Sequence, residues 1–182
     1  MNRKKYGCEI ELSVETLSFK HKKYLKAFSC GKESLDEYFK TKALDDEDAT
    51  THIFIDKEAK KPIALVSLSC SGIMLNSSTK FYIYPAVEIK MFALNEEYKN
   101  LKYSNEKNDN EKLSDKIFNY IIFKLICDFT DNYCGAGRIV LYSLPDKVSF
   151  YKDRHNFCDF VELMYPNDEM YLKDCVPLYF KY

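Results

Sequence analysis

One glutamate stands inside an otherwise apolar segment, and a carboxyl group in such a place can act as a base. Glu88 lies in the run Ala86–Leu94, whose other members are hydrophobic apart from Lys90. Burial disfavours the charged form of a carboxyl group and raises its pKa, which brings a general base closer to neutral pH. The alternative is an ion pair between Glu88 and Lys90 or another neighbour. The residues alone favour neither.

Seven cysteines and three histidines could hold a metal ion or form disulfides, but their spacing argues against both. The number of cysteines is odd, and no pair has the two-residue separation typical of zinc sites. No signal peptide opens the chain, and no apolar run has the length of a membrane span. We therefore expect free, mostly buried thiols in a reduced cytoplasm, with no metal and no membrane partner.

Charge is almost balanced over the 182 residues, with 27 basic and 28 acidic side chains. A chain of this length fits one domain. The net charge of −1 supplies no global positive field that would attract nucleic acid. Two short basic clusters, at 3–5 and 20–23, are predicted to be solvated surface.

Hydrophobic periodicity predicts an alternation of strands and helices. In the first half of the chain we expect a strand over Cys8–Val14, a short helix around Tyr24–Phe28, a helix over Ser34–Leu44, and strands over Thr51–Ile55 and Pro62–Leu68. In the second half we expect strands over Phe81–Tyr84, Ala86–Leu94 and Arg138–Ser143, a long helix over Leu113–Thr130 capped by Ser114, a short helix over Pro145–Tyr151, and strands over Phe157–Met164 and Met170–Tyr182. A strand–helix–strand crossover with antiparallel strands around it indicates an α/β protein, with a mixed sheet and helices on both faces.

Three segments resemble motifs of one enzyme family. Phe28–Phe39, with the sequence FSCGKESLDEYF, resembles the F-x-C-G/S-x-x-x-L-D-x-[WYF]-[LF] opening of toxin-type GNAT acetyltransferases. Tyr84–Leu94 resembles the central strand of GNAT enzymes, and Ser149–Phe157 is similar to their F-Y-x-x-x-G-F element. The order and spacing of the three segments also fit, so the resemblance runs from Phe19 to the C-terminus.

The resemblance implies a layered GNAT-like fold, with a mixed sheet of about six or seven strands. It implies one domain over residues 1–182, in which residues 1–18 form an N-terminal strand or extension. Such sheets splay between the fourth and fifth strands, which leaves peptide groups without partners. The pantetheine arm of acetyl-CoA has amides that complete those hydrogen bonds. The backbone of Met91, Phe92 and Leu94 would bind it and stabilise the oxyanion of the thioester.

The resemblance also implies two catalytic side chains. Tyr151 matches the family tyrosine that protonates the leaving thiolate, and a phenol with a pKa of about 10 keeps its proton at neutral pH. The alternative is an ordinary core tyrosine. Glu88 occupies the place of the catalytic glutamate in the histone-acetyltransferase branch, although toxin-type members usually lack that glutamate.

The phosphate-binding loop departs from the family pattern. GNAT enzymes carry [QR]-x-x-G-x-[GA], whose glycines let backbone amides wrap the pyrophosphate at a helix N-terminus. Residues 99–115 contain no glycine. One explanation is a different cradle, formed by Lys99, Lys102, Lys107, Leu113, Ser114 and Asp115. The other is that CoA binding has been lost, which the negative charge of Glu111 and Asp115 favours.

The sequence thus predicts an acetyl-CoA-dependent N-acetyltransferase, because Tyr151 and the strand motif are intact. Its acceptor amine is left open among small molecules, protein lysines and aminoacyl-tRNA, and the near-neutral charge counts against tight tRNA binding. The resemblance is compatible with a homodimer and with a partner antitoxin. The alternative function is a catalytically degenerate GNAT-fold module that acts through a protein partner.

Overall fold

The computed structural model describes residues 10–76, 80–103, 111–161, 164–166 and 174–182. Two compact units divide the chain. Unit 1 comprises Met1–Ser67 and Met91–Tyr120, and unit 2 comprises Leu68–Lys90 and Ile121–Tyr182. The division falls within two long strands and one long helix. The expectation of one domain over 1–182 stays a prediction.

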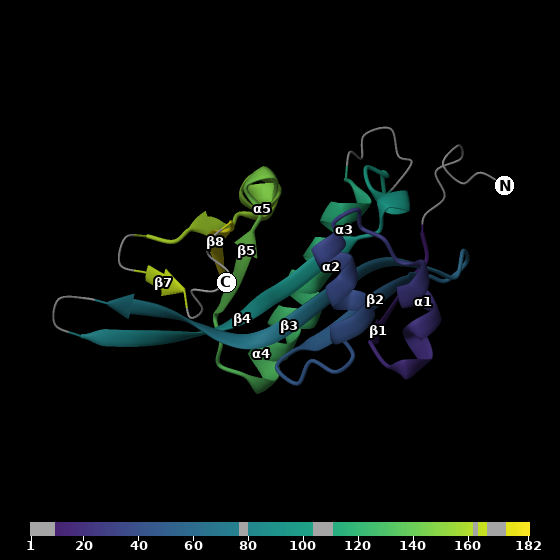
Figure 1. Ribbon diagram of the computed structural model, residues 1–182. Helices are drawn as coiled ribbons and strands as arrows, with labels where there is room; N and C mark the ends of the chain where they lie inside the picture. Colours follow the sequence, from purple (N-terminus) through teal and green to yellow (C-terminus); the bar gives the residue numbers. More distant parts are fainter. Residues whose placement is uncertain (1–9, 77–79, 104–110, 162–163, 167–173) are drawn as a thin grey trace. The chain divides into compact units, whose positions relative to one another are not determined.

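The described strands form an eight-stranded mixed sheet, which confirms the predicted fold class (Figure 1). The hydrogen-bonded order is β1-β2-β3-β4-β5-β8-β6, and β7 pairs with β3 off this path. The strands are β1 (Leu12–Thr16), β2 (Thr50–Asp56), β3 (Lys61–Asn76), β4 (Phe81–Leu94), β5 (Arg138–Ser143), β6 (Cys158–Asp159), β7 (Met164–Pro166) and β8 (Val176–Lys181).

Helices separate the strands as expected. They are α1 (Lys22–Ala27), α2 (Glu33–Glu37), α3 (Leu113–Tyr120), α4 (Asp128–Tyr133) and α5 (Val148–His155), with 3-10 turns over Phe19–His21, Glu96–Tyr98 and Pro145–Lys147. Two π-helical segments, Tyr38–Lys42 and Ile121–Cys127, continue α2 and α3 respectively. None of the helices in the described ranges has the length and apolar character needed to cross a membrane.

The middle of the sheet differs from the prediction. β3 continues to Asn76, well past the expected end at Leu68, and β4 joins the two strands expected on either side of Pro85. The φ of proline lies within the extended region, so only its missing N–H opposes a strand, and the chain runs on through it. The distal halves of β3 and β4 therefore form a long hairpin in unit 2 (Figure 1).

Unit 1 is built on aromatic residues of its helices. Phe28, at the end of α1, and Phe39, in the π-helical turn, are buried and meet edge to face with ring centroids 6.0 Å apart. Both join a core cluster that includes Ile53 of β2 and Leu65 of β3. The helical spacing found in the sequence is thus the spacing that carries these side chains into the core.

Alternation along β4 places helices on both faces of the sheet in unit 1. Met91 packs against the core cluster that contains Phe28 and Phe39. The next side chain, Phe92, meets Phe118 of α3 with ring centroids 5.4 Å apart. Successive side chains of a strand point to opposite faces, so α1 and α2 cover one face and α3 covers the other.

Unit 2 has the predicted crossover. β4 and β5 are parallel, and β5 pairs antiparallel with β8 along its whole length. β5 has the bounds that the sequence predicted, Arg138–Ser143. The described residues after α5 form three strands, β6, β7 and β8, where two were predicted. Tyr182, the last residue, hydrogen-bonds through its hydroxyl to the Thr130 hydroxyl and the Ala136 carbonyl, which fixes the end of β8 to the end of α4.

The packing of unit 1 predicts one large mutational effect. Phe39→Ala should lower the free energy of unfolding by about 3–5 kcal/mol, because it removes a fully buried ring and leaves a cavity. Urea unfolding followed by far-UV circular dichroism measures the loss. Phe19→Ala is the control, since that ring is 68% exposed and its loss should change stability little. Equal effects of the two substitutions would show that Phe39 is not a core residue.

Candidate functional site

The C-terminal end of β4 extends past its parallel partner. The ladder between β4 and β5 consists of Val87–Ile139, Glu88–Val140 and Ile89–Leu141. β4 itself continues to Leu94, so its last residues lie beyond the end of this ladder. An extended segment with one unpaired edge presents N–H and C=O groups that need other partners.

The direction of the peptide groups in this segment follows from a neighbouring hydrogen bond. The N–H of Asn95 donates to the Ile63 carbonyl of β3 at 2.8 Å. Peptide groups alternate in direction along a strand, so those of Met91 and Ala93 point toward β3 as well. The peptide groups of Phe92 and Leu94 point to the other edge. Of the three residues that the sequence selected for pantetheine binding, these two have the suitable direction.

Side chains in the same segment are largely committed to the core. Ala93 is buried, Met91 packs beside it, and Phe92 contacts Phe118. What this segment can offer a ligand is therefore mainly its backbone. An amide-containing ligand is the chemical class that a free strand edge binds.

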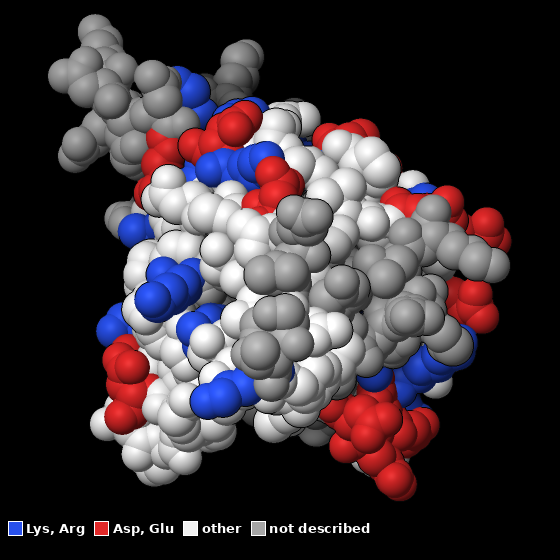
Figure 2. Space-filling model, turned by 90° about the vertical axis from the view of Figure 1, so that its left-hand side faces the viewer, with Lys and Arg blue, Asp and Glu red and all other residues white. Residues whose placement is uncertain are grey.

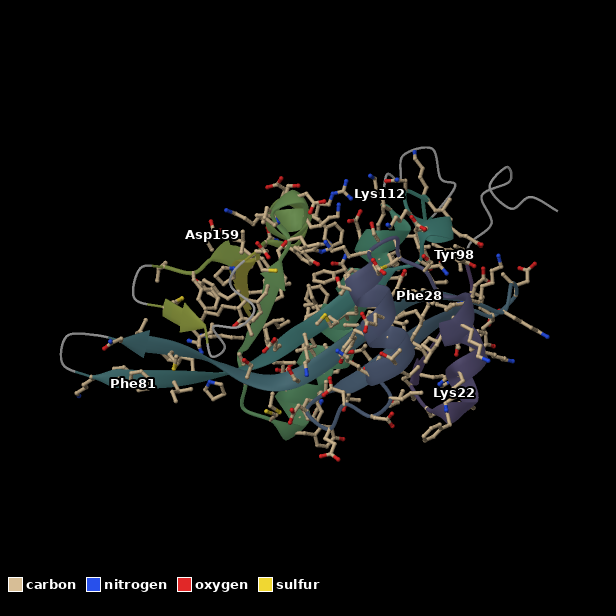
Figure 3. The ribbon with its side chains drawn as sticks, in the orientation of Figure 1. Lys22, Phe28, Phe81, Tyr98, Lys112 and Asp159 are labelled. Carbon is tan, nitrogen blue, oxygen red and sulfur yellow. The ribbon has the colours of Figure 1, made fainter. Side chains whose placement is uncertain are left out.

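The turn that follows β4 is held rigidly. The Asn95 side-chain amide donates to the Pro62 carbonyl at 2.9 Å, and its side-chain oxygen accepts from the Glu97 N–H at 3.2 Å. Tyr98 is buried, and its hydroxyl donates to the Asp56 carboxylate at 3.3 Å (Figure 3). The end of the candidate binding strand is thus fixed before any ligand arrives.

Lys99, which the resemblance placed near a phosphate, has a hydrogen-bond partner within the chain. Its ammonium group donates to the Cys30 carbonyl at 2.6 Å, which ties the turn after β4 to the loop before α2. A phosphate ligand would have to compete with this hydrogen bond. Lys99 therefore joins two loops of unit 1.

The contacts of the loop before α2 explain the residue types of the F-x-C-G motif. Cys30 donates its N–H to one oxygen of Asp36 at 2.8 Å, and the Ser29 hydroxyl donates to the other at 3.1 Å. Gly31 has a φ of +75°, and a Cβ atom there would lie 2.4 Å from a carboxylate oxygen of Glu96. The motif aspartate is thus a loop anchor, and the motif glycine allows the close approach. Asp36 was not among the predicted site residues, although the L-D pair of the motif was the available signal.

Burial makes the motif cysteine unreactive. Removal from water raises the pKa of the Cys30 thiol to about 11, so it stays protonated at neutral pH. The expectation of free, buried thiols is met at Cys30 and Cys127, whereas Cys70 and Cys158 are exposed. Among the residues whose placement is described, no group of three or more His, Cys, Asp or Glu side chains could hold a metal ion.

The glycine-free loop returns to α3 as a short antiparallel ribbon. The Tyr103 N–H donates to the Glu111 carbonyl at 3.0 Å, the Leu113 N–H donates to the Leu101 carbonyl at 2.9 Å, and Lys102 and Lys112 form a bridge between them. Residues 104–110 lie outside the described residues, and Lys107 is among them.

Asp115 caps the N-terminus of α3. Its carboxylate accepts the Lys112 N–H at 3.2 Å, while the Lys112 carbonyl accepts the N–H groups of Asp115 and Lys116 at 3.0 and 3.1 Å. This is the reciprocal half of a capping box, in which the third helical residue reaches back to the cap. The prediction that Ser114 caps the helix is wrong, because α3 begins at Leu113, as predicted, and Ser114 is already its second residue.

Tyr151, the motif tyrosine, lies on α5. The Tyr151 carbonyl accepts hydrogen bonds from the N–H groups of Asn156 and Phe157, the latter at 3.1 Å, and the helix ends there. Asn156 has a φ of +58° and takes the left-handed position where the family motif has glycine. His155 makes this element one residue longer than F-Y-x-x-x-G-F. Burial raises the pKa of the Tyr151 hydroxyl, so it holds its proton at neutral pH.

Glu88 is half-buried and lies opposite Val140 in the parallel ladder. Its side chain shares a face of β4 with Ala86, which belongs to the small core of unit 2. Glu88 and Tyr151 thus belong to unit 2, whereas the residues selected for donor binding belong to unit 1.

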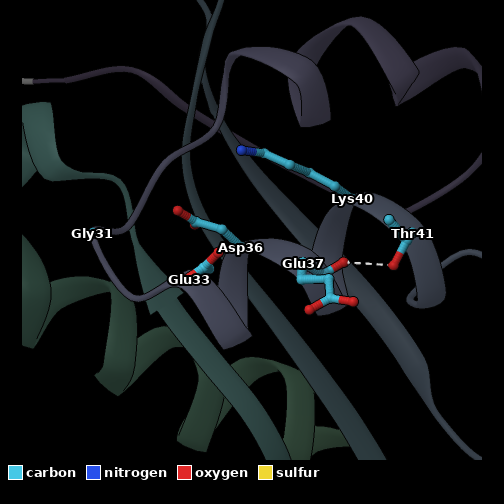
Figure 4. A pocket seen from close by; sticks show the side chains of 6 residues that line it. All are labelled: Gly31, Glu33, Asp36, Glu37, Lys40 and Thr41. Carbon is cyan, nitrogen blue, oxygen red and sulfur yellow. Dashed lines mark hydrogen bonds between the residues drawn. The ribbon is translucent and has the colours of Figure 1, made fainter.

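A shallow pocket of about 600 Å³ lies on α2 and its π-helical continuation in unit 1 (Figure 4). Its lining residues are Gly31, Glu33, Asp36, Glu37, Lys40 and Thr41. Three carboxylates and one ammonium group favour a cationic ligand over an anionic one. None of the residues selected from the sequence lines this pocket.

Several solved structures have a fold similar to that of this chain. A bacterial toxin matches with a TM-score of 0.68 at 14% identity, over 94% of this chain and 91% of that chain. A tyrosine-to-phenylalanine mutant of KacT gives 0.66 at 15% identity, over 94% and 95%. AtaT complexed with acetyl-methionyl-tRNAfMet gives 0.66 at 13% identity, over 94% and 95%. No protein-family model and no curated protein sequence matches the chain.

This chain has the fold of the toxin-type GNAT acetyltransferases. The resemblance found in the three sequence motifs is thereby confirmed at the level of the fold. At these identities the likeness concerns the fold, so the activity is taken up as a proposal.

Asp36→Ala tests the loop anchor. At pH 7 the substitution should lower the free energy of unfolding by about 1–3 kcal/mol, since it leaves the Cys30 N–H without its acceptor. Burial raises the pKa of the Asp36 carboxyl, but the hydrogen bonds from Cys30 and Ser29 outweigh this and lower the pKa overall. A carboxyl with a lowered folded-state pKa stabilises above its unfolded pKa and loses that contribution as the pH falls through its folded pKa.

The difference between wild type and Asp36→Ala should therefore shrink as the pH falls below about 4. Urea titrations at several pH values between 3 and 7 measure it. Glu37→Ala, which removes the neighbouring exposed carboxylate, should show a small effect at every pH. A difference that grows toward low pH would contradict the anchoring role of the ionised carboxylate.

Proposed function

We propose that this protein is an N-acetyltransferase that transfers the acetyl group of acetyl-CoA to an amine. The observation that carries the proposal is the open edge of β4 at Phe92 and Leu94, in a fold shared with toxin acetyltransferases. Solved structures of this fold include AtaTR bound with acetyl-CoA. The pantetheine amides would pair with the peptide groups of Phe92 and Leu94, as an added strand pairs with a sheet edge.

The reaction is a direct acyl transfer. The deprotonated amine attacks the thioester carbonyl, a C–N bond forms, and the C–S bond breaks after a tetrahedral oxyanion has formed. A backbone N–H of the β4 segment stabilises that oxyanion. The amine loses one proton to a base, and the departing thiolate gains one from an acid, so charge and protons balance.

Tyr151 is the proposed acid. Burial raises the pKa of its phenol, so it carries a proton at neutral pH that it can donate to the departing thiolate. Structures of this fold include tyrosine-to-phenylalanine mutants of KacT and AtaT, which supports a tyrosine as the residue of interest. Glu88 is the proposed base, as a half-buried carboxylate in the central strand. An alternative base is a water molecule.

Aminoacyl-tRNA is one proposed acceptor, because an AtaT structure of this fold contains acetyl-methionyl-tRNAfMet. On the face shown in Figure 2, basic and acidic side chains are interspersed, in keeping with the net charge of −1. A tRNA partner would usually meet a basic surface, so a small amine or a protein lysine stays an equal proposal. Structures of AtaT with the antitoxin AtaR support an antitoxin partner for this chain, and a homodimer is proposed from the sequence resemblance alone.

A degenerate binding module is the second candidate function, because the N-terminus of α3 is already capped by Asp115. Titration with acetyl-CoA separates the two candidates. A thermal shift that saturates with acetyl-CoA supports the enzyme, whereas no shift supports the module. For the enzyme, release of free thiol from acetyl-CoA in the presence of a panel of amines then identifies the acceptor.

Tyr151→Phe should lower kcat by about 10²-fold or more while leaving the affinity for acetyl-CoA nearly unchanged, since only proton donation is removed. Thiol release measures turnover, and calorimetric titration measures donor affinity. Tyr133→Phe is the matched control, because that side chain is 81% exposed. Equal loss of turnover and donor affinity would assign Tyr151 a structural role.

Glu88→Gln should retain the fold and flatten the rise of kcat/KM with pH, because the base that must ionise has been removed. Glu47→Gln in the exposed loop after the π-helical turn should leave the profile unchanged. The measurement is a pH–rate profile between pH 6 and 9, with circular dichroism to verify folding. An unaltered rise in Glu88→Gln would assign deprotonation to water or another group.

A further inference from the structure

A helix N-terminus binds a phosphate through amide N–H groups that have no other acceptor. The positive end of the helix dipole adds attraction, and a carboxylate placed there uses the same attraction. Whether such a site is available can therefore be judged from the acceptors that the first amides already have. For α3, the structure defines the acceptors of the N–H groups of Lys112, Leu113, Asp115 and Lys116.

The chain itself occupies the amides at this helix end. The Lys112 N–H donates to the Asp115 carboxylate, and the Leu113 N–H donates to the Leu101 carbonyl. Leu113 is fully buried, so its amide lies beneath the surface. A diphosphate arriving here would have to break both hydrogen bonds.

The carboxylates near the start of α3 also oppose the binding of a diphosphate. The Asp115 carboxylate already carries the negative charge that a helix N-terminus favours. The nearby Lys116 ammonium lies 4.0 Å from a carboxylate oxygen of Glu111 and 4.9 Å from the centre of the Tyr103 ring. The Lys116 charge is thus partly balanced by Glu111, and a diphosphate at the start of α3 would meet the carboxylates of Glu111 and Asp115 as well as nearby lysines.

The edge of β4, unlike the start of α3, is suited to binding part of the donor. The peptide groups of Phe92 and Leu94 lie past the end of the β4–β5 ladder, and no charged residue lies between them in the chain. The segment is held from behind by the Asn95 hydrogen bonds to β3. A preorganised edge of this kind offers an amide chain its full set of hydrogen bonds at little ordering cost.

We infer that this protein recognises its acyl donor through the pantetheine arm, and that the nucleotide diphosphate adds little to binding. The donor class is then any acyl thioester of pantetheine, of which acetyl-CoA is one member and acetyl-pantetheine a shorter one. This inference rests on the proposed function and narrows its donor specificity.

The test compares two donors on the wild-type protein. Calorimetric titration should give dissociation constants for S-acetyl-pantetheine and acetyl-CoA that differ by less than about tenfold. Thiol release with an amine acceptor should show both donors turning over. Acetyl-pantetheine that binds more than about a hundredfold more weakly than acetyl-CoA would overturn the inference.

The Asp115→Asn variant sharpens the comparison. Asparagine keeps an oxygen that can accept the Lys112 N–H but removes the negative charge that opposes a diphosphate. The affinity for acetyl-CoA should rise by about threefold to tenfold, and the affinity for acetyl-pantetheine should not change. Asp45→Asn, with the same charge change in an exposed loop, should alter neither. A fall in acetyl-CoA affinity, or equal changes for both donors, would contradict the inference.

The outcomes separate this inference from the proposed function. If neither thioester binds, the acetyltransferase proposal fails, and the donor inference fails with it. If acetyl-CoA binds and turns over while acetyl-pantetheine does not, the acetyltransferase stands and the donor inference alone is overturned. Thermal unfolding of each variant establishes that it is folded, and the wild-type comparison of donors decides the matter without any variant.

Discussion

Peptide groups at the end of β4 that lie beyond the β5 ladder, within the described part of the chain, are the constraint on which the rest of this structure depends. The ladder with β5 ends at the Ile89–Leu141 pair, while the strand continues to Leu94. A strand edge costs free energy unless something completes its hydrogen bonds. The protein keeps this edge extended by packing Ala93 into the core and fixing Asn95 to β3. In the proposed function, this edge receives a ligand with amides of its own.

The loops around that strand are fixed by buried and half-buried carboxylates. Asp36 holds the loop before α2, Asp56 accepts from Tyr98 after β4, and Asp115 closes the start of α3. Each carboxylate accepts backbone or hydroxyl donors that would otherwise be left without a partner. The rigidity that binding requires therefore comes from the protein itself, and one consequence is a helix N-terminus with less room for an external anion.

Much of the architecture follows from local patterns in the sequence. The helical spacing of Leu35, Phe39 and Ala43 and the dense apolar run at Arg138–Ser143 set element types, because side-chain period and burial are properties of a few consecutive residues. The motifs predicted the fold because they mark local backbone geometry. Gly31 and Asn156 both have left-handed backbone conformations, which few residue types adopt readily. The predicted strand break at Pro85 is wrong, because a proline in an extended segment removes a hydrogen-bond donor without ending the strand.

Hydrogen-bond partners distant in the chain could not be predicted in this way. The resemblance placed Lys99 and Asp115 near a phosphate, and only the folded chain shows that Lys99 donates to the Cys30 carbonyl and that Asp115 caps its own helix. Likewise, the strand pattern of the sequence does not show that the peptide groups of Phe92 and Leu94, and not those of Met91 and Ala93, point away from β3. These contacts depend on which segments the fold brings together, and the competition among acceptors is settled by geometry that no short stretch of sequence contains.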